Sequence, residues 1–202
     1  MLTIPKLLNH CENIAGLTIA ELAKKHKVDL NTNNKGIIGQ LLELELQTEA
    51  KNKALPDFID LGVELKTIPV NDDFKPLEST YVSMVSFNNM PRWSKSFVRL
   101  KLLKVLWIPI LKKKNIHTSE ICYPIFKELS LEDEYILSKD YEELCEIITF
   151  GDEPRAHLGK FMQVRPKALN SKIRSTSNNE IRHPLGFYLR SSYTKKIFNN
   201  FI

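Results

Sequence analysis

The chain has 202 residues, of which 43% are hydrophobic and 26% are charged, enough for the packed core of one domain over residues 1–202, which we expect to have two lobes. It has no apolar run long enough to span a membrane and no apolar signal core at its N-terminus, so we expect a cytoplasmic protein without a membrane partner. Its three cysteines are scattered, without a CxxC pair, and its five histidines lie far apart, which argues against a disulfide framework or a zinc site.

The formal net charge of +5 is unevenly distributed along the sequence. Between Arg155 and Ile202 there are ten Lys and Arg residues against one acid, Glu180, a net charge of +9. Such a basic segment is typical of proteins that bind phosphate backbones. A solvated basic face without a partner is the alternative, and charge alone does not decide between the two.

The first third of the chain reads as helical. Pro5–Ala15 is predicted to form a short helix, and a second begins after Thr18, whose hydroxyl can form a capping box with Glu21. Apolar residues at helical spacing predict a third helix from Ile37. Glu43 lies within it and Lys35 just before it. About eight residues of helix rise roughly 12 Å, so both could border one groove without touching.

A strand over Val63–Val70 carries the most informative pattern in the chain. Glu64 and Lys66 lie two residues apart and therefore point to the same face of the strand. The intervening turn allows Asp57 to return beside Glu64. An acid after a proline, then acid-x-lysine, is typical of metal-dependent DNA-cutting enzymes. A strand edge with a surface Glu–Lys pair and an unrelated Asp is the alternative reading of these three residues.

The chemistry of this pattern favours Mg²⁺. Two adjacent carboxylates repel each other and raise each other's pKa, and a divalent cation removes that conflict. Magnesium prefers oxygen ligands and is held by one or two carboxylates together with substrate phosphates. The Lys66 ammonium would orient a water or offset charge in the transition state.

The remaining elements follow in chain order. Apolar alternation predicts a strand over Thr80–Val85 and one or two more within Phe97–Ile110, with Trp107 in the core. Leu131–Phe150 is predicted to be a helix that ends at Gly151. The last quarter predicts, in order, a strand over Phe161–Val164, a loop over Asn170–Asn179, a strand over Gly186–Leu189 and a helix over Tyr193–Ile202.

Six ordered blocks carry a resemblance to a known family. They are Lys35–Glu43, Leu61–Val70, Pro76–Val82, Val105–Pro109, Gln163–Ala168 and Gly186–Leu189. Together the blocks resemble the MutH family of DNA mismatch repair endonucleases, within the type II restriction endonuclease-like superfamily. The resemblance runs from about Leu7 to the last helix. Ile37 departs from the family pattern, which often has an aromatic residue there, and Asn115–Leu129 matches poorly, so we expect that segment to be variable surface.

The resemblance implies an α/β fold: a restriction-endonuclease-like mixed sheet flanked by helices, with two lobes forming a DNA-binding cleft. It assigns a catalytic set and a set of DNA contacts. In the catalytic set Asp57, Glu64 and the Leu65 carbonyl would hold the metal, Lys66 would serve the water, and Glu43 would complete the acidic group. The DNA-binding set is Lys35, Lys101, Arg165, Pro166, Lys167 and Tyr188.

Within the DNA-binding set, Lys35 and Lys101 would contact the backbone near the cut. The Arg165-Pro166-Lys167 loop would read bases, since Arg and Lys suit guanine acceptors in the major groove. Tyr188 would help to sense adenine methylation. Without the resemblance, Arg165 could equally contact a phosphate and Tyr188 could equally be a core residue.

The implied reaction is a Mg²⁺-dependent single-strand cut in the unmethylated strand of hemimethylated GATC sites. The enzyme would act as a monomer on double-stranded DNA, with a MutL-type mismatch repair protein as its partner. Two other functions stay open on the sequence: a GATC-specific restriction endonuclease, and a non-catalytic DNA-binding module.

Overall fold

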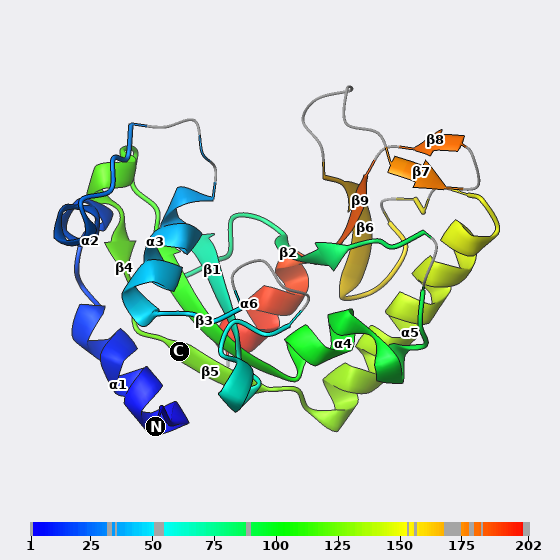
Figure 1. The fold of residues 1–202 in the computed structure, drawn as a ribbon, viewed down its shortest axis with the longest axis horizontal. Helices are drawn as coiled ribbons and strands as arrows, with labels where there is room; N and C mark the ends of the chain where they lie inside the picture. Colours follow the sequence, from blue (N-terminus) through cyan, green and yellow to red (C-terminus); the bar gives the residue numbers. More distant parts are fainter. Residues whose placement is uncertain are drawn as a thin grey trace. The chain divides into compact units, whose positions relative to one another are not determined.

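The computed structural model describes residues 2–31, 34, 36–50, 55–87, 90–152, 154–155, 157–167, 175–177, 180–182 and 184–199; for 175–177 and 180–182 only the backbone is described. The chain forms two compact units. Unit 1 comprises Met1–Glu78, Lys101–Glu128 and Lys195–Ile202, and unit 2 comprises Ser79–Leu100 and Leu129–Thr194. Figure 1 shows the elements of each.

Unit 1 is built on a mixed four-stranded sheet. Its central pair is β1 (Glu64–Val70) and β3 (Lys104–Leu111), which run parallel, with Glu64 opposite Val105. Two short strands, β4 (Glu120–Ile121) and β5 (Ile125–Glu128), pair antiparallel with β3. The sheet therefore combines both strand orientations, as expected for the predicted class.

Three helices cover one face of this sheet (Figure 1): α1 (Ile4–Ile14), α2 (Ile19–His26) and α3 (Ile37–Leu46). The predicted capping box at Thr18 and Glu21 is present at the start of α2. Leu41 and Leu42 of α3 are buried in one core with Leu65 and Leu106 of the sheet. Packing of α3 against β1 thus fixes where residues of α3 lie relative to the strand that carries Glu64 and Lys66.

The other face of the sheet packs against α6 (Ser191–Asn199), whose C-terminal half belongs to unit 1. Trp107 is 1% exposed and its ring meets Phe198 edge to face, with centroids 6.2 Å apart. The predicted core position of Trp107 is confirmed.

Unit 2 contains a three-stranded antiparallel sheet in the order β2 (Thr80–Met84), β9 (Leu185–Leu189) and β6 (Met162–Pro166). The long helix α5 (Leu131–Thr149) packs on it through Tyr141, whose ring centroid lies 5.2 Å from that of Phe187. A separate hairpin joins β7 (Ser175–Ser177) and β8 (Glu180–Arg182). Three single turns complete the described chain: η1 (Ile59–Leu61), η2 (Trp93–Lys95) and η3 (Ile116–Thr118).

The structure corrects the prediction for the segment that precedes β3. Phe97–Leu102 is the helix α4 and not a strand. The Ser96 hydroxyl accepts a hydrogen bond from the Arg99 amide at 3.0 Å and so caps the first turn. Val98 and Leu102, four residues apart, are both buried. The strand-like alternation in this stretch was therefore the apolar stripe of a short helix.

Two loop or surface predictions were also wrong. Asn115–Leu129 contributes β4 and β5, and Ile121 within it is 1% exposed, so part of this segment is core. Ser175–Ser177 forms a hairpin strand inside the predicted loop over Asn170–Asn179. Short strands of two to four residues carry too little periodicity to be found from sequence.

The rest of the fold confirms the mixed α/β class with sheets flanked by helices. Within the described residues no helix has both the length and the apolarity needed to cross a membrane.

Candidate active site

A tight turn places Asp57 beside the start of β1. The amide of Phe58 donates to the carbonyl of Val63 at 2.9 Å, and the amide of Val63 donates back at 3.2 Å. Gly62 closes the turn in the left-handed region, with φ of +63°, a conformation that favours glycine. Asp57 Oδ2 consequently accepts a hydrogen bond from the Leu65 amide at 2.9 Å. The carboxylate is thus anchored to the strand that carries Glu64.

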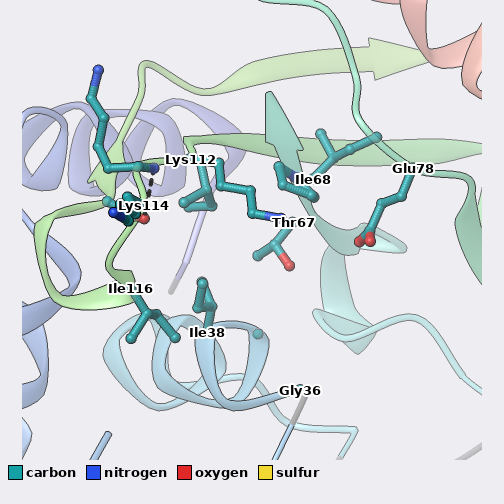
Figure 2. Close-up of a pocket in the computed structure, with 13 residues that line it drawn as sticks. Gly36, Ile38, Thr67, Ile68, Glu78, Lys112, Lys114 and Ile116 are labelled. Carbon is teal, nitrogen blue, oxygen red and sulfur yellow. Dashed lines mark hydrogen bonds between the residues drawn. The ribbon is translucent and has the colours of Figure 1, made fainter. Parts of the chain in front are cut away.

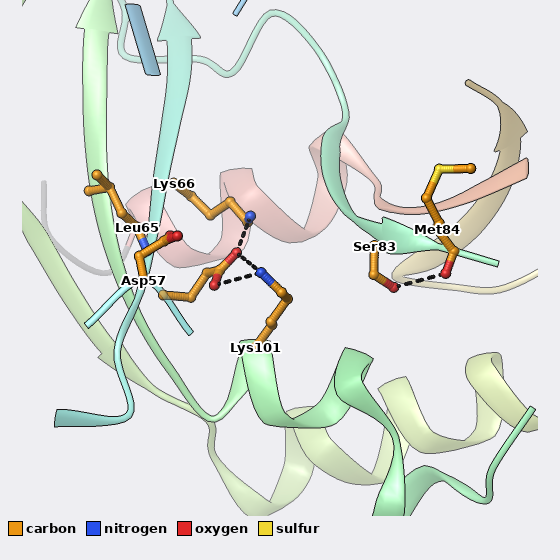
Figure 3. Close-up of polar contacts among 7 residues, drawn as sticks. Asp57, Leu65, Lys66, Ser83, Met84 and Lys101 are labelled. Carbon is orange, nitrogen blue, oxygen red and sulfur yellow. Dashed lines mark hydrogen bonds and ion pairs between the residues drawn. The ribbon is translucent and has the colours of Figure 1, made fainter. Parts of the chain in front are cut away.

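Two ammonium groups converge on Glu64. The residue is 1% exposed, and its Oε1 lies 2.6 Å from Lys66 Nζ. Lys101 Nζ, near the end of α4, lies 3.0 Å from both Oε1 and Oε2. Figure 3 shows both lysine side chains pointing to the same carboxylate, with Asp57 alongside. A buried charge is tolerated only when it is paired, and here two cations share that role.

Burial and neighbouring acids raise the pKa values of Asp57 and Glu43. Burial raises the pKa of Asp57, and the neighbouring charge of Glu64 raises it further, against the opposing effects of the Leu65 amide and the two lysines. Glu43 is exposed as a residue, yet partial burial of its carboxyl raises its pKa, and Asp57 and then Glu64 add to the rise. The three carboxyl groups therefore lie within electrostatic range of one another, with two ammonium groups among them.

This arrangement suits a hard divalent cation in its donor chemistry. Asp57 and Glu64 supply carboxylate oxygens, and each would be stabilised by positive charge, as the raised pKa of Asp57 indicates. Within the described residues, no three His, Cys, Asp or Glu side chains gather closely enough to form a metal site by themselves. A site with two carboxylates completed by a backbone carbonyl and substrate oxygens agrees with both observations.

A second group of predicted residues lies together in unit 2. Arg165 lies on β6, Lys167 directly follows the last residue of that strand, and Tyr188 lies on the neighbouring strand β9. The Arg165 guanidinium carbon is 5.7 Å from the centroid of the Tyr188 ring. Pro166 lies between the two cations, paired with Leu185 across the strands. The structure thus brings these four residues into one cluster, whereas Lys35 lies outside the described residues.

Comparison with known proteins decides the family. A profile described as "DNA mismatch repair enzyme MutH" matches residues 46–140. The chain is 42% identical to the DNA mismatch repair protein MutH of Haemophilus influenzae (strain PittEE), covering 99% of this chain and 96% of that protein. The chain belongs to the MutH family. It is also 41% identical to the DNA mismatch repair protein MutH of Actinobacillus pleuropneumoniae serotype 5b (strain L20), covering 98% and 93% of the two chains. The protein of that name in Histophilus somni (strain 2336) is 42% identical, covering 98% and 94%.

Two contact residues of this MutH-family chain escaped the sequence reading. The Ser79 hydroxyl accepts a hydrogen bond from Arg165 Nη1 at 2.8 Å. Tyr81 lies opposite Tyr188, and its ring carries the Lys167 ammonium at 3.6 Å from the centroid. Both lie in the Pro76–Val82 block, but no local pattern gives either residue a role, because each acts through a partner more than eighty positions away. The nearness of Lys101 to Glu64 was also not foreseen, since Lys101 was expected only at the DNA backbone.

Unit 1 also contains a cavity of about 400 Å³ that is separate from the group formed by Asp57 and Glu64. It lies between the start of α3, β1 and the 112–119 loop, and Thr67 faces it (Figure 2). Thr67 follows Lys66 on the strand and therefore points to the opposite face of the sheet. The acidic residues Asp57 and Glu64 do not line this cavity.

Proposed function

We propose that this chain is a Mg²⁺-dependent endonuclease that nicks the unmethylated strand of hemimethylated GATC sites during DNA mismatch repair. The observation that carries the proposal is the convergence of Lys66 and Lys101 on the buried Glu64, next to Asp57. Membership of the MutH family supplies the repair context and the target sequence.

In this proposal Asp57, Glu64 and the Leu65 carbonyl would hold the metal. When bound, the metal would supply Lewis acidity that polarises a phosphoryl oxygen and lowers the pKa of a bound water. Lys66 Nζ lies 2.6 Å from Glu64 Oε1, and its ammonium would orient the attacking water. Glu43 adds negative charge at the edge of the same group, which favours cations there.

The scissile phosphate would draw on the two lysines. Its oxygens would give Lys101 and Lys66 a second anionic partner besides the buried Glu64. Such contacts position the DNA backbone without reading its sequence. Lys35, which precedes α3 in the sequence, would also contact the backbone. Because both ammonium groups now neutralise Glu64, the approach of a phosphate would also release carboxylate oxygens for the metal.

Base reading would fall to the cluster in unit 2. Arg165 and Lys167 suit guanine acceptors, and Pro166 shapes the strand between them. Burial raises the pKa of Tyr188, and Tyr81 adds to the rise while Arg165 opposes it, so its hydroxyl stays protonated at neutral pH. A neutral hydroxyl packed near the adenine amino group would reject the bulk of a methyl group.

Double-stranded DNA is the substrate, and a MutL-type mismatch repair protein is the proposed partner that couples a distant mismatch to the nick. We propose a monomer, because one active site per chain cuts one strand. Action on the chromosome would place the protein in the cytoplasm.

A plasmid assay tests this function. Supercoiled DNA with a single GATC site is prepared unmethylated, hemimethylated and fully methylated, and each form is incubated with Mg²⁺, with and without a MutL-type protein. We expect slow nicking that MutL stimulates, confined to unmethylated strands. Rapid linearisation without MutL would instead identify a restriction enzyme. Absence of a nick under every condition, with DNA binding that is indifferent to Mg²⁺ and Ca²⁺, would identify a non-catalytic binding module.

A further inference from the structure

The sheet of unit 2 has two chemically different faces. Buried apolar residues of β6 and β9, Met162, Val164, Phe187 and Leu189, form the face towards α5. Successive strand residues point to opposite faces, so Gln163, Arg165 and Tyr188 point away from that helix. These three residues and Tyr81 of β2 define what we call the polar face.

Strand register lines up the polar face in one row. Tyr188 of β9 lies directly opposite Tyr81 on one side and directly opposite Gln163 on the other. The two tyrosine rings meet edge to face with centroids 5.4 Å apart. A Cβ at Gly186 would lie 3.1 Å from a ring carbon of each tyrosine, so the glycine is what lets both rings settle onto the sheet.

Arg165 of the polar face and the nearby Lys167 are already held in place. Arg165 is fixed by the Ser79 hydroxyl at 2.8 Å and by the Tyr188 ring, while Lys167 lies over Tyr81. A guanidinium has five N–H groups, and its bond to Ser79 uses only one nitrogen, so donors remain for a ligand. The polar face is therefore an ordered surface rather than a set of loose side chains.

Gln163 is the exception among the polar residues of this row. It is half-buried, and within the described part of the chain its amide makes no hydrogen bond. Its register partner is Tyr188 and its neighbour two residues along the strand is Arg165. An amide without a protein partner keeps its acceptor and its two donors available to a ligand.

We propose that Gln163 reads the major-groove edge of an adenine in the target site. A carboxamide matches adenine in both hydrogen-bonding directions: Oε1 accepts from the N6 amino group, and Nε2 donates to N7. This inference rests on the proposed function, because it takes the adenine of GATC as the ligand and Arg165 as the reader of the adjacent guanine. It adds a residue and a defined atom pair to that site.

The contact between Gln163 and adenine also explains how adenine methylation would be detected beside Tyr188. In the duplex, one N6 hydrogen of adenine pairs with thymine and the other is offered to the major groove. N6-methylation leaves a single hydrogen for base pairing, so Oε1 of Gln163 loses its donor and meets a methyl group instead. Methylation would thus remove the hydrogen bond to Gln163, while Tyr188 would exclude the added methyl group by its bulk.

The test pairs a protein change with a base change. Gln163→Leu removes both hydrogen-bonding groups at similar size, and 7-deazaadenine in place of the target adenine removes N7. For the wild-type protein and for Gln163→Leu, nicking rates are measured in Mg²⁺ and binding affinities in Ca²⁺. The substrates are short duplexes with the analogue placed in one strand at a time. An analogue at an adenine outside the site is the matched control.

We expect the wild-type protein to lose roughly ten- to a hundredfold in specificity on the analogue, and Gln163→Leu to lose a similar factor on normal DNA. Combined, the two changes should cost little more than either alone. Gln163→Glu, which keeps only the acceptor, should be nearly insensitive to 7-deazaadenine. Thermal unfolding of both variants shows that they are folded.

Independent, multiplying losses in the variant and the analogue would overturn the assignment of Gln163, and so would a wild-type protein indifferent to 7-deazaadenine. These outcomes leave the proposed function intact if the wild-type protein still prefers GATC. Equal nicking of GATC and of sites without it would overturn the proposed function and this inference together.

Discussion

Lys101 Nζ lies 3.0 Å from both carboxylate oxygens of Glu64, although 37 residues separate them in the chain. With Lys66 on the same carboxylate, Glu64 is paired with two cations before any ligand enters. The catalytic groups therefore hold one another in position, and a metal or a phosphate must exchange with an existing ion pair. The predictions below follow from this geometry and from the cluster in unit 2.

Lys66→Ala should reduce Mg²⁺-dependent nicking by at least a hundredfold, because it removes the ammonium aligned on Glu64. Binding to a GATC duplex in Ca²⁺ should change less than tenfold. Lys75→Ala is the matched control, since Lys75 is an exposed lysine of the same unit that pairs with Asp73. A Lys66→Ala protein that nicks at the wild-type rate would refute the assigned role.

Metal binding should be visible without catalysis. A cation that binds only the folded protein stabilises it by RT ln(1 + [L]/Kd), so the unfolding temperature rises with metal concentration. We expect Mn²⁺ or Ca²⁺ to raise the midpoint of the wild-type protein, and to leave Asp57→Asn and Glu64→Gln unaffected. Differential scanning fluorimetry with increasing metal measures this, with Asp73→Asn as the control. An equal metal response in all four proteins would place the ion elsewhere.

Tyr188→Phe should weaken discrimination between unmethylated and methylated sites. The change removes the hydroxyl and keeps the ring that packs against Tyr81 and Arg165. We expect the ratio of nicking rates on the two substrates to fall by roughly fivefold or more, with overall stability unchanged. Tyr135→Phe, at an exposed tyrosine of α5, is the control. An unchanged ratio would make Tyr188 a packing residue only.

Ser79→Ala should loosen the Arg165 side chain. The hydroxyl fixes one guanidinium nitrogen at 2.8 Å, and an exposed hydrogen bond of this kind contributes about 1 kcal/mol. We expect a several-fold loss of preference for GATC over sites with the guanine replaced, with little change in nicking of non-target DNA. Ser79→Thr should restore the preference. Loss of activity on all sequences alike would point to a general structural role instead.

Acid stability should depend on Glu45, a buried carboxylate that joins the three N-terminal helices. Its burial raises its pKa, but hydrogen bonds from Lys25, His26 and His10 outweigh this and lower it to about 2. A carboxyl with a depressed pKa in the folded state stabilises the fold above its ordinary pKa and loses that effect as the pH falls towards the folded value.

For Glu45 the loss should therefore occur between pH 4.5 and about 2. We expect Glu45→Gln to cost about 3 kcal/mol of unfolding free energy at neutral pH. The difference from the wild-type protein should shrink across that acidic window in urea unfolding experiments. Glu12→Gln, at an exposed position of α1, is the control. A difference that is constant with pH would show that the charge of Glu45 contributes no net stability.

Local patterns gave much of the secondary structure. The Thr18 capping box, the apolar stripe through Tyr141, Leu144 and Ile148, and the strand that carries Glu64 and Lys66 all lie where expected. These signals are local, since capping and periodicity are properties of a few successive residues. Phe97–Leu102 was mistaken for a strand because six residues are too few for the two periods to be told apart.

The sequence by itself determined the family, the acid-acid-lysine set and the charge that points to DNA. Only the tertiary structure decided which distant residues complete each site. Lys101 reaches Glu64 because β1 and β3 pair in parallel and the helix before β3 ends beside β1. Ser79 reaches Arg165, and Gln163 falls in line with Tyr188, because β9 pairs with both of its neighbours in a defined register. Register and packing are set by the whole core at once, so no short segment of the sequence encodes them.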